Sequence, residues 1–160
     1  SMKLQFDKQN ATTALEVSGK NFIVEADRLH ITSVIYNLLD NALKYSKEKP
    51  HISIHILDQV NFLEFRVSDN GIGIAEEYRN KIFEQSFRVP DGDRHNIKGY
   101  GLGLSYVNHI IKRHQGFIEL ETAPDKGSTV IVKIPFKEAP VIYYDKNRRV
   151  IKKTIRIGRL

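Results

Sequence analysis

The sequence between residues 37 and 45 reads Asn37-Leu-Leu-Asp-Asn41-Ala-Leu-Lys44-Tyr45 and lies within the longest helical pattern of the chain. Asp27 is a suitable N-cap for this helix. Apolar residues then recur at steps of three and four residues until about Ser46, which predicts a helix of about five turns.

Two amide side chains share one face of this helix. Asn37 and Asn41 are four residues apart, and Lys44 follows one turn later. Amide oxygens suit a hard cation such as Mg²⁺, whereas a lysine can meet a phosphate oxygen. A solvated helix face is the alternative interpretation, and taken alone the cluster favours that alternative.

Shorter patterns on both sides of this helix predict the other elements. Strands are expected before it at Lys3–Phe6, Thr13–Val17 and Asn21–Val24, and after it at His51–Ile56, Phe62–Val67, Phe117–Thr122 and Ser128–Pro135. A short helix is expected at Ala75–Phe83, a polar mobile loop at Gln85–Lys98 and a second long helix at Gly101–His114. This order predicts an α/β fold, a two-layer sandwich in which helices cover one face of a mixed sheet.

Asp69-Asn-Gly71-Ile-Gly73 directly follows the strand that is predicted to end at Val67. Two glycines separated by one residue let the backbone approach a flat ligand closely. A carboxylate at a strand end can accept a hydrogen bond from the exocyclic amine of adenine, which guanine does not offer in that place. A tight Asp-Asn-Gly turn without a ligand is the competing interpretation.

Gly99-Tyr-Gly101-Leu-Gly103-Leu104 follows the polar loop and opens the second long helix. Glycines that open a helix leave N–H groups directed at an anion, and the helix dipole favours negative charge there. The spacing differs from the GxGxxG dinucleotide pattern, and the Lys-Ser/Thr of a P-loop is absent. If the segment were only a flexible hinge, Gly103 would cost the first helical turn about 1 kcal/mol relative to alanine.

Taken in order, these clusters resemble the nucleotide-binding boxes of sensor histidine kinase catalytic domains, which share an ATP-binding fold with gyrase, Hsp90 and MutL. The resemblance covers about residues 3–136. Its boxes are Asn37 with Asn41, Asp69-x-Gly71-x-Gly73, Phe83-x-x-x-Phe87, Gly99-x-Gly101-x-Gly103-Leu104 and Gly127-Ser-Thr129. The presence of all these boxes in the order of the family is far more specific than any single motif. The resemblance implies the Bergerat-type form of the α/β sandwich.

The resemblance also implies roles for individual residues. Asn41 would coordinate Mg²⁺ between the phosphates with support from Asn37, and Lys44 and Tyr45 would line the pocket. Asp69 would bind the adenine amine. The remaining base contacts would come from Gly71, Gly73 and the hydroxyl of Thr129.

The phosphate end is implied in the same way. Phe83 and Phe87 would anchor residues 85–98 as a lid over the triphosphate, although plain core packing of the two rings is an equal alternative. Arg88 and Lys98 would contact the γ-phosphate. Further cofactor contacts would come from Gly99, Gly101, Leu102, Gly103 and Leu104. The catalytic set implied is Asn37, Asn41, Lys44 and Arg88.

Three departures from the family pattern bear on activity. Gyrase-like and Hsp90-like enzymes have a water-activating glutamate where this chain has Asn37, so rapid ATP hydrolysis is not expected. The family's phosphoacceptor histidine lies in a helical hairpin before the catalytic domain, and none of the six histidines here has that setting. The proline often found between the two phenylalanines is replaced by Gln85 and Ser86, which puts the shape of the lid in question.

Composition limits the domain organisation. The chain has 160 residues and no cysteine, which suits one compact domain and excludes disulfides and cysteine-bound zinc. The net charge of +6 comes entirely from residues 137–160, because residues 1–136 carry 17 basic and 17 acidic side chains. We therefore expect an ATP-binding domain at 1–136 and a basic extension of unknown role at 137–160. Residues 141–144 and 150–157 are suited to a basic hairpin, with a solvated extension as the alternative.

The expected function is that of the kinase module of a two-component sensor. It would transfer the γ-phosphate of Mg-ATP to a histidine on a separate hairpin, for onward transfer to a response-regulator receiver. A non-catalytic nucleotide-sensing or protein-interaction module is the alternative. We expect no nucleic-acid partner, no membrane span in this chain, a monomeric fragment and a cytoplasmic location, with the parent protein either free or anchored in the inner membrane.

Overall fold

The structure is a computed structural model that describes residues 2–89, 102–136, 138–144 and 150–156. Its helices are α1 (Met2–Lys8), α2 (Arg28–Tyr45) and α3 (Gly103–Arg113), with two 3₁₀ turns, η1 (Glu76–Tyr78) and η2 (Lys81–Phe83). Its strands are β1 (Thr12–Ser18), β2 (His51–Asp58), β3 (Phe62–Asp69), β4 (Phe117–Thr122), β5 (Ser128–Pro135), β6 (Glu138–Tyr144) and β7 (Val150–Arg156).

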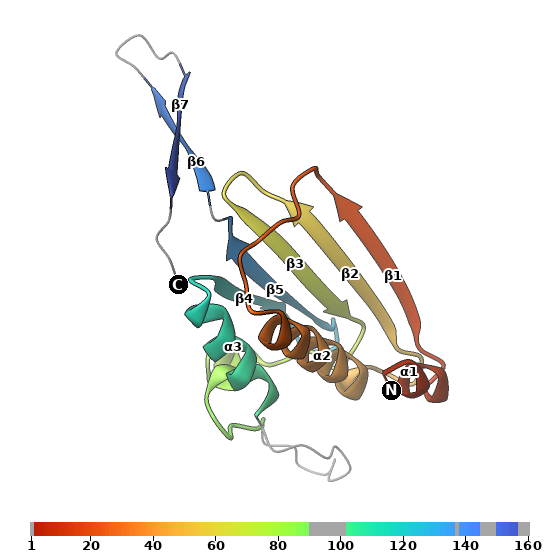
Figure 1. Ribbon diagram of the computed structural model, residues 1–160. Coiled ribbons are helices and arrows are strands. Elements are labelled where there is room, and N and C mark those ends of the chain that lie inside the picture. Colours follow the sequence, from red (N-terminus) through yellow and green to blue (C-terminus); the bar gives the residue numbers. More distant parts are fainter. Residues whose placement is uncertain (1, 90–101, 137, 145–149, 157–160) are drawn as a thin grey trace.

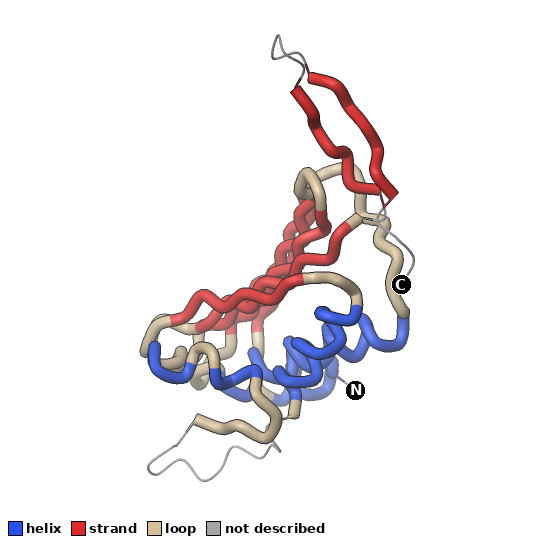
Figure 2. Tube along the Cα trace, turned by 90° about the vertical axis from the view of Figure 1, so that its left-hand side faces the viewer, coloured by secondary structure: helices blue, strands red, loops and turns tan. Residues whose placement is uncertain are grey.

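One mixed sheet forms the first layer, with the strand order β1-β2-β3-β5-β4 (Figure 1). β1 and β2 are parallel, and the other neighbours are antiparallel. α2 is the crossover that a parallel pair requires. The helices lie on one side of the sheet (Figure 2), so the predicted two-layer α/β sandwich with a mixed sheet is confirmed.

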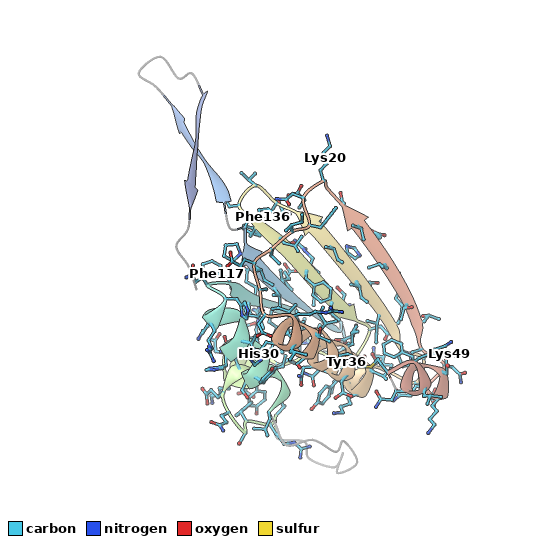
Figure 3. All side chains as sticks on the ribbon, in the orientation of Figure 1. Lys20, His30, Tyr36, Lys49, Phe117 and Phe136 are labelled. Atoms are coloured by element: carbon cyan, nitrogen blue, oxygen red, sulfur yellow. The ribbon has the colours of Figure 1, made fainter. Side chains whose placement is uncertain are left out.

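The core lies between α2, α3 and the sheet, where side chains fill the space between the two layers (Figure 3). The buried residues of this core include Leu38 on α2, Ile111 on α3 and Ile52 on β2. The N-cap prediction for α2 is confirmed, because a carboxylate oxygen of Asp27 accepts the N–H of His30 at 3.0 Å. In the part of the chain that the structure describes, no helix is long and apolar enough to cross a bilayer.

Two strands predicted near the N-terminus are wrong. Lys3–Phe6 lies in α1, where Met2 and Phe6 are one helical turn apart and half-buried while the residues between them are exposed. Residues 21–24 form a loop rather than a strand. There the carboxylate of Asp58 accepts the N–H groups of Lys20 and Asn21, both at 2.9 Å, so side-chain bonds replace a strand ladder.

The helix predicted at Ala75–Phe83 is wrong in type. The segment forms η1 and η2 instead, with the N–H of Tyr78 bonded to the carbonyl of Ala75 at 3.0 Å. Nucleating an α-helix over so few residues is costly, and short segments commonly settle as 3₁₀ turns. The Arg79 side chain ties the segment to the sheet through the Leu120 carbonyl at 2.9 Å.

The C-terminal extension contains the predicted hairpin, although its first strand begins at Glu138 rather than residue 141. β6 and β7 pair as a separate two-stranded sheet that extends away from the main sheet in Figures 1 and 2. The connecting residues 145–149 lie outside the described ranges. Phe136, labelled in Figure 3, follows β5 and is buried. The proposed domain boundary after it stays a prediction.

Candidate functional site

A cavity of about 690 Å³ lies between α2, the start of α3 and the ends of β3 and β5. It brings together most of the residues singled out from the sequence. These are Asn37, Asn41, Lys44, Tyr45, Asp69, Gly73, Phe87, Arg88, Leu102, Gly103 and Leu104. Segments more than 60 residues apart in the chain therefore converge on one space, and its volume is typical of a small-molecule site.

Asp69 closes one end of the cavity at the last position of β3. Its Oδ1 accepts the N–H of Gly71 at 2.7 Å and the N–H of Ser128 at 3.2 Å. Burial raises the pKa of this carboxyl above its usual value, and the two backbone N–H groups oppose that shift. The carboxylate is thus held rigidly through one oxygen.

The chain after Asp69 depends on glycine at Gly73. This residue has a φ of +67°, and a Cβ atom there would lie 1.8 Å from the carbonyl oxygen of Ala123. Only glycine meets both conditions without strain. The sharp turn that results brings Ile72 and Ile74 to the wall of the cavity.

The two asparagines of α2 also line the cavity, near the start of α3. The Nδ2 of Asn37 donates to the carbonyl of Ser33 at 2.8 Å. A Cβ atom at Gly103 would lie 3.1 Å from Oδ1 of Asn37 and 3.4 Å from Nδ2 of Asn41. The missing side chain of Gly103 therefore leaves a small space beside both amides.

The two amides beside this space are of the chemical type that binds a hard cation. Amide oxygens are suitable ligands for Mg²⁺, which binds through few protein groups plus substrate phosphates and water. Gly103 is also the first residue of α3, so N–H groups at the start of this helix lie next to the amides. Asn41 remains the residue that we expect to hold the metal.

Lys44 and Tyr45 lie at the end of α2 beside the cavity. Lys44 Nζ lies 2.5 Å from a carboxylate oxygen of Asp40, which also lines the cavity. The Tyr45 carbonyl accepts the N–H of Ile72 at 3.1 Å, which fixes the chain after β3 against the end of α2. Asp40 was not predicted from the sequence.

The two phenylalanines of the predicted lid anchor have different places. Phe87 lines the cavity and packs on Tyr78, with ring centroids 5.9 Å apart, whereas Phe83 is not among the residues that line it. Arg88 lines the cavity beside Phe87. Lys98, Gly99, Gly101 and most of the predicted lid lie outside the described residues, so those assignments stay predictions.

Thr129, whose hydroxyl was predicted to contact the base, is not among the residues that line the cavity, whereas the neighbouring Ser128 is. Thr129 pairs with Ser68 across β3 and β5, and their hydroxyls are 2.8 Å apart. Ser128 pairs with Asp69 and lines the cavity. Because neighbouring residues of a strand point to opposite faces, Thr129 faces away from the cavity, and the base contact assigned to its hydroxyl stays a prediction.

Sequence reasoning also missed the apolar wall of the cavity. Gly71 was assigned to the pocket but does not line it. A Cβ atom there would lie 2.2 Å from the carbonyl oxygen of Tyr45, so the glycine lets the segment after β3 pack closely against the end of α2. The apolar residues that line the cavity without having been predicted are Leu38, Ala42, Val67, Ile72, Ile74, Ile82, Val89, Leu120 and Val130. Only their nearness in sequence to the motifs could have pointed to them.

Comparison with known proteins agrees with this geometry. The family model described as histidine kinase-, DNA gyrase B- and HSP90-like ATPase matches residues 26–138. Sensor protein RprX of Bacteroides fragilis is 37% identical over 134 residues, which cover 82% of this chain and 26% of RprX. Sensor histidine kinase WalK of Bacillus subtilis is 35% identical over 133 residues, which cover 82% of this chain and 22% of WalK.

Solved structures give the same result. The catalytic domain of histidine kinase ThkA superposes with a TM-score of 0.72 at 32% identity, covering 84% of this chain and 86% of that one. The chain thus spans about a quarter of the curated relatives' length but nearly all of an isolated catalytic domain. It belongs to the histidine kinase, DNA gyrase B and HSP90-like ATPase family, as a catalytic domain of the sensor histidine kinase type.

Proposed function

We propose that this domain binds Mg-ATP and transfers the γ-phosphate to a histidine on a helical hairpin outside the chain. The observation that supports this most strongly is the convergence of Asp69, Asn41 and Gly103 on one cavity of about 690 Å³. A hydrogen-bond acceptor for a base, a cation ligand and a helix N-terminus for phosphate then lie in one space.

Each group has a distinct task in this proposal. Asp69 accepts from the adenine amine through the oxygen that its two backbone contacts leave available, and Asn41 holds the metal ion with Asn37 beside it. Lys44 and Arg88 offer positive charge to the phosphates. When bound, the magnesium ion neutralises negative charge on the phosphate oxygens as transfer proceeds.

The transfer itself needs positioning more than a base. A neutral imidazole nitrogen of the acceptor forms a bond to the γ-phosphorus while the bond from that phosphorus to the β-phosphate oxygen breaks, and ADP leaves with the bonding electrons. Water would need a base in order to attack, and the amide of Asn37 cannot accept a proton at neutral pH. The site therefore favours transfer to histidine over hydrolysis.

A response-regulator receiver is the proposed next acceptor. The support is a solved structure of histidine kinase ThkA in complex with the response regulator protein TrrA. This chain is 29% identical to the ThkA chain of that complex and superposes on it with a TM-score of 0.68. The superposed residues make up 84% of this chain and 36% of that ThkA chain.

We expect this domain to label a separately prepared acceptor hairpin from its parent protein when the two are mixed with γ-labelled ATP and Mg²⁺. The label should be acid-labile, as phosphohistidine is. The control is the same hairpin with its acceptor histidine replaced by alanine, which should stay unlabelled. ATP binding without any labelling of the intact hairpin would support the non-catalytic nucleotide-sensing module instead.

Adenosine affinity is expected to fall on acidification at a higher pH than an ordinary aspartate would require. Burial raises the folded-state pKa of Asp69 above the unfolded value of 3.8, so the ionised acceptor is lost as the pH falls through that raised pKa. The same shift means that ionised Asp69 costs folding stability at neutral pH, and that the cost is relieved on acidification. Calorimetry with adenosine, which lacks titrating phosphates, from about pH 7 down to about pH 4 tests this, because an aspartate of ordinary pKa stays mostly ionised down to about pH 4. A flat profile would contradict it.

A further inference from the structure

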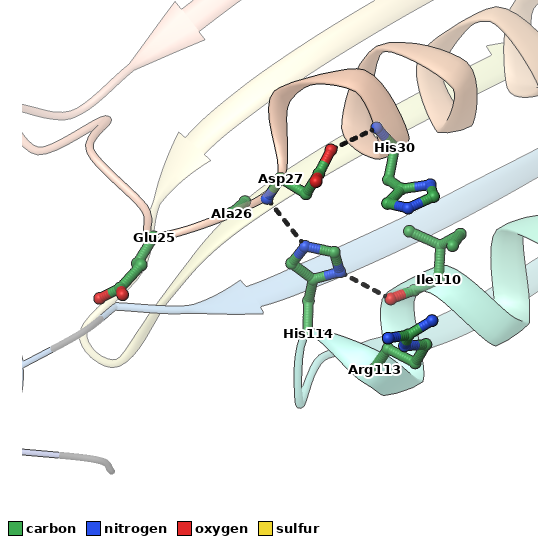
Figure 4. Close-up of a pocket in the computed structure, with 7 residues that line it drawn as sticks. All are labelled: Glu25, Ala26, Asp27, His30, Ile110, Arg113 and His114. Carbon is green, nitrogen blue, oxygen red and sulfur yellow. Dashed lines mark hydrogen bonds between the residues drawn. The ribbon is translucent and has the colours of Figure 1, made fainter. Parts of the chain in front are cut away.

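A second cavity, of about 380 Å³, lies where the N-terminus of α2 meets the C-terminus of α3 (Figure 4). His114 lines it together with Asp27 and His30. His114 is only 8% exposed, which is unusual among the polar residues that the structure describes. None of the tasks proposed above for the nucleotide site uses it.

His114 joins the two helices through both ring nitrogens, as the dashed lines in Figure 4 show. Nε2 accepts the backbone N–H of Asp27 at 3.0 Å, and Nδ1 donates to the carbonyl of Ile110 at 2.8 Å. A backbone N–H can only donate and a carbonyl can only accept. These partners make Nε2 the acceptor of the ring and Nδ1 its donor.

The bridge formed by the hydrogen bond between Asp27 and His114 connects the ends of two helices. Asp27 is the N-cap of α2, and His114 is the C-cap of α3. A second polar contact, between Nδ1 of His30 and the hydroxyl of Tyr106 at 3.0 Å, joins the same helices along their length. The helix ends are thus tied by hydrogen bonds with defined directions, in addition to apolar packing.

The opposite end of the same helix pair is the phosphate end of the nucleotide site. There Gly103, the first residue of α3, lies against Asn37 and Asn41 of α2. A change in the tilt or rotation of α3 about its His114 end would move Gly103 relative to both amides. Asp69 is on β3 and takes no part in the bridge, so the base end would not move with it.

We propose that His114 is a positioning residue that holds α3 against α2 and thereby sets the distance between Gly103 and the metal-binding amides. This inference rests on the proposed function of the nucleotide site. It predicts an effect confined to the phosphate half of that site, which a general loss of packing would not produce.

The test compares two substitutions of nearly equal length and volume. In His114→Gln the side-chain oxygen can still accept the Asp27 N–H, whereas His114→Met fills the same space without an acceptor. The exposed His109 on the same helix supplies the control His109→Met. Calorimetry then measures the affinity of each variant for a Mg-bound non-hydrolysable ATP analogue and for adenosine, and thermal melting reports folding.

We expect His114→Met to bind the ATP analogue about fivefold more weakly, the size of effect produced by losing one hydrogen bond, while adenosine affinity is unchanged. His114→Gln and His109→Met should match the wild type for both ligands. Should His114→Met fail to fold, His114→Asn replaces it, because that side chain can keep the Ile110 bond but cannot reach Asp27.

The inference is overturned if His114→Met and His114→Gln bind the analogue equally well, or if analogue and adenosine weaken by the same factor. A wild-type chain that binds neither ligand would instead refute the proposed function, and the positioning role with it. Wild-type binding of both ligands without any difference between the His114 variants would leave the proposed function intact.

Discussion

Asp69→Asn is expected to weaken ATP binding by about 1–3 kcal/mol, or roughly 5- to 150-fold. In the native site Oδ1 accepts the N–H groups of Gly71 and Ser128. An asparagine can keep its own oxygen at those two donors, which directs its NH₂ group to the place where the native carboxylate would accept from adenine. Two donors would then face each other. Isothermal calorimetry with a non-hydrolysable ATP analogue measures the loss.

The same geometry predicts a change of base preference. Inosine presents a carbonyl oxygen where adenine has its amine, so the Asp69→Asn variant should bind ITP better relative to ATP than the wild type does. Asp58→Asn is a matched control, since Asp58 also ends a strand and accepts two backbone N–H groups, from Lys20 and Asn21, but does not line the cavity. Equal ATP affinity in wild type and Asp69→Asn would refute the assignment of the base.

The parts of the site that follow from local geometry could be predicted from the sequence. Asn37 and Asn41 share a face because any α-helix places residues four apart together, and Asp27 could be identified as an N-cap from its position before the apolar pattern. The strand pair Phe117–Thr122 and Ser128–Pro135 was predicted with the bounds that the structure has, because alternating residues flank an obvious turn.

The parts that depend on distant partners could not be predicted. Ser128 faces the cavity and Thr129 does not, because β5 pairs with β3 in a register that sets Ser128 opposite Asp69. Nothing within the Gly-Ser-Thr motif distinguishes the two hydroxyls. The role of His114 is equally hidden, since its partner Asp27 is 87 residues away in the sequence.

The N-terminal error has a related cause. Residues 3–6 are too few to show a period, and what decides between strand and helix there is the packing of Phe6 against the core. Local propensity is a weak guide where a single tertiary contact supplies most of the stabilisation.

Asn41→Ala is expected to remove the dependence of ATP affinity on Mg²⁺. Removing a residue that hydrogen-bonds to a metal ligand typically lowers metal affinity about 10- to 100-fold. Removing the ligand itself should lower the affinity at least as much. Calorimetric titration with the ATP analogue, in Mg²⁺ and then in excess EDTA, should give two different affinities for the wild type and one weak affinity for the variant.

Adenosine provides the internal control for this substitution, because the variant keeps Asp69 and should bind the nucleoside as the wild type does. Asn41→Asp is the rescue variant, since a carboxylate oxygen can replace the amide oxygen as a magnesium ligand. A Mg²⁺ effect of the same size in wild type and Asn41→Ala would show that the metal is held elsewhere. Because the amides of Asn37 and Asn41 both lie within 3.6 Å of the Cβ position at Gly103, Asn37→Ala would then be the next substitution to test, with the same pair of titrations.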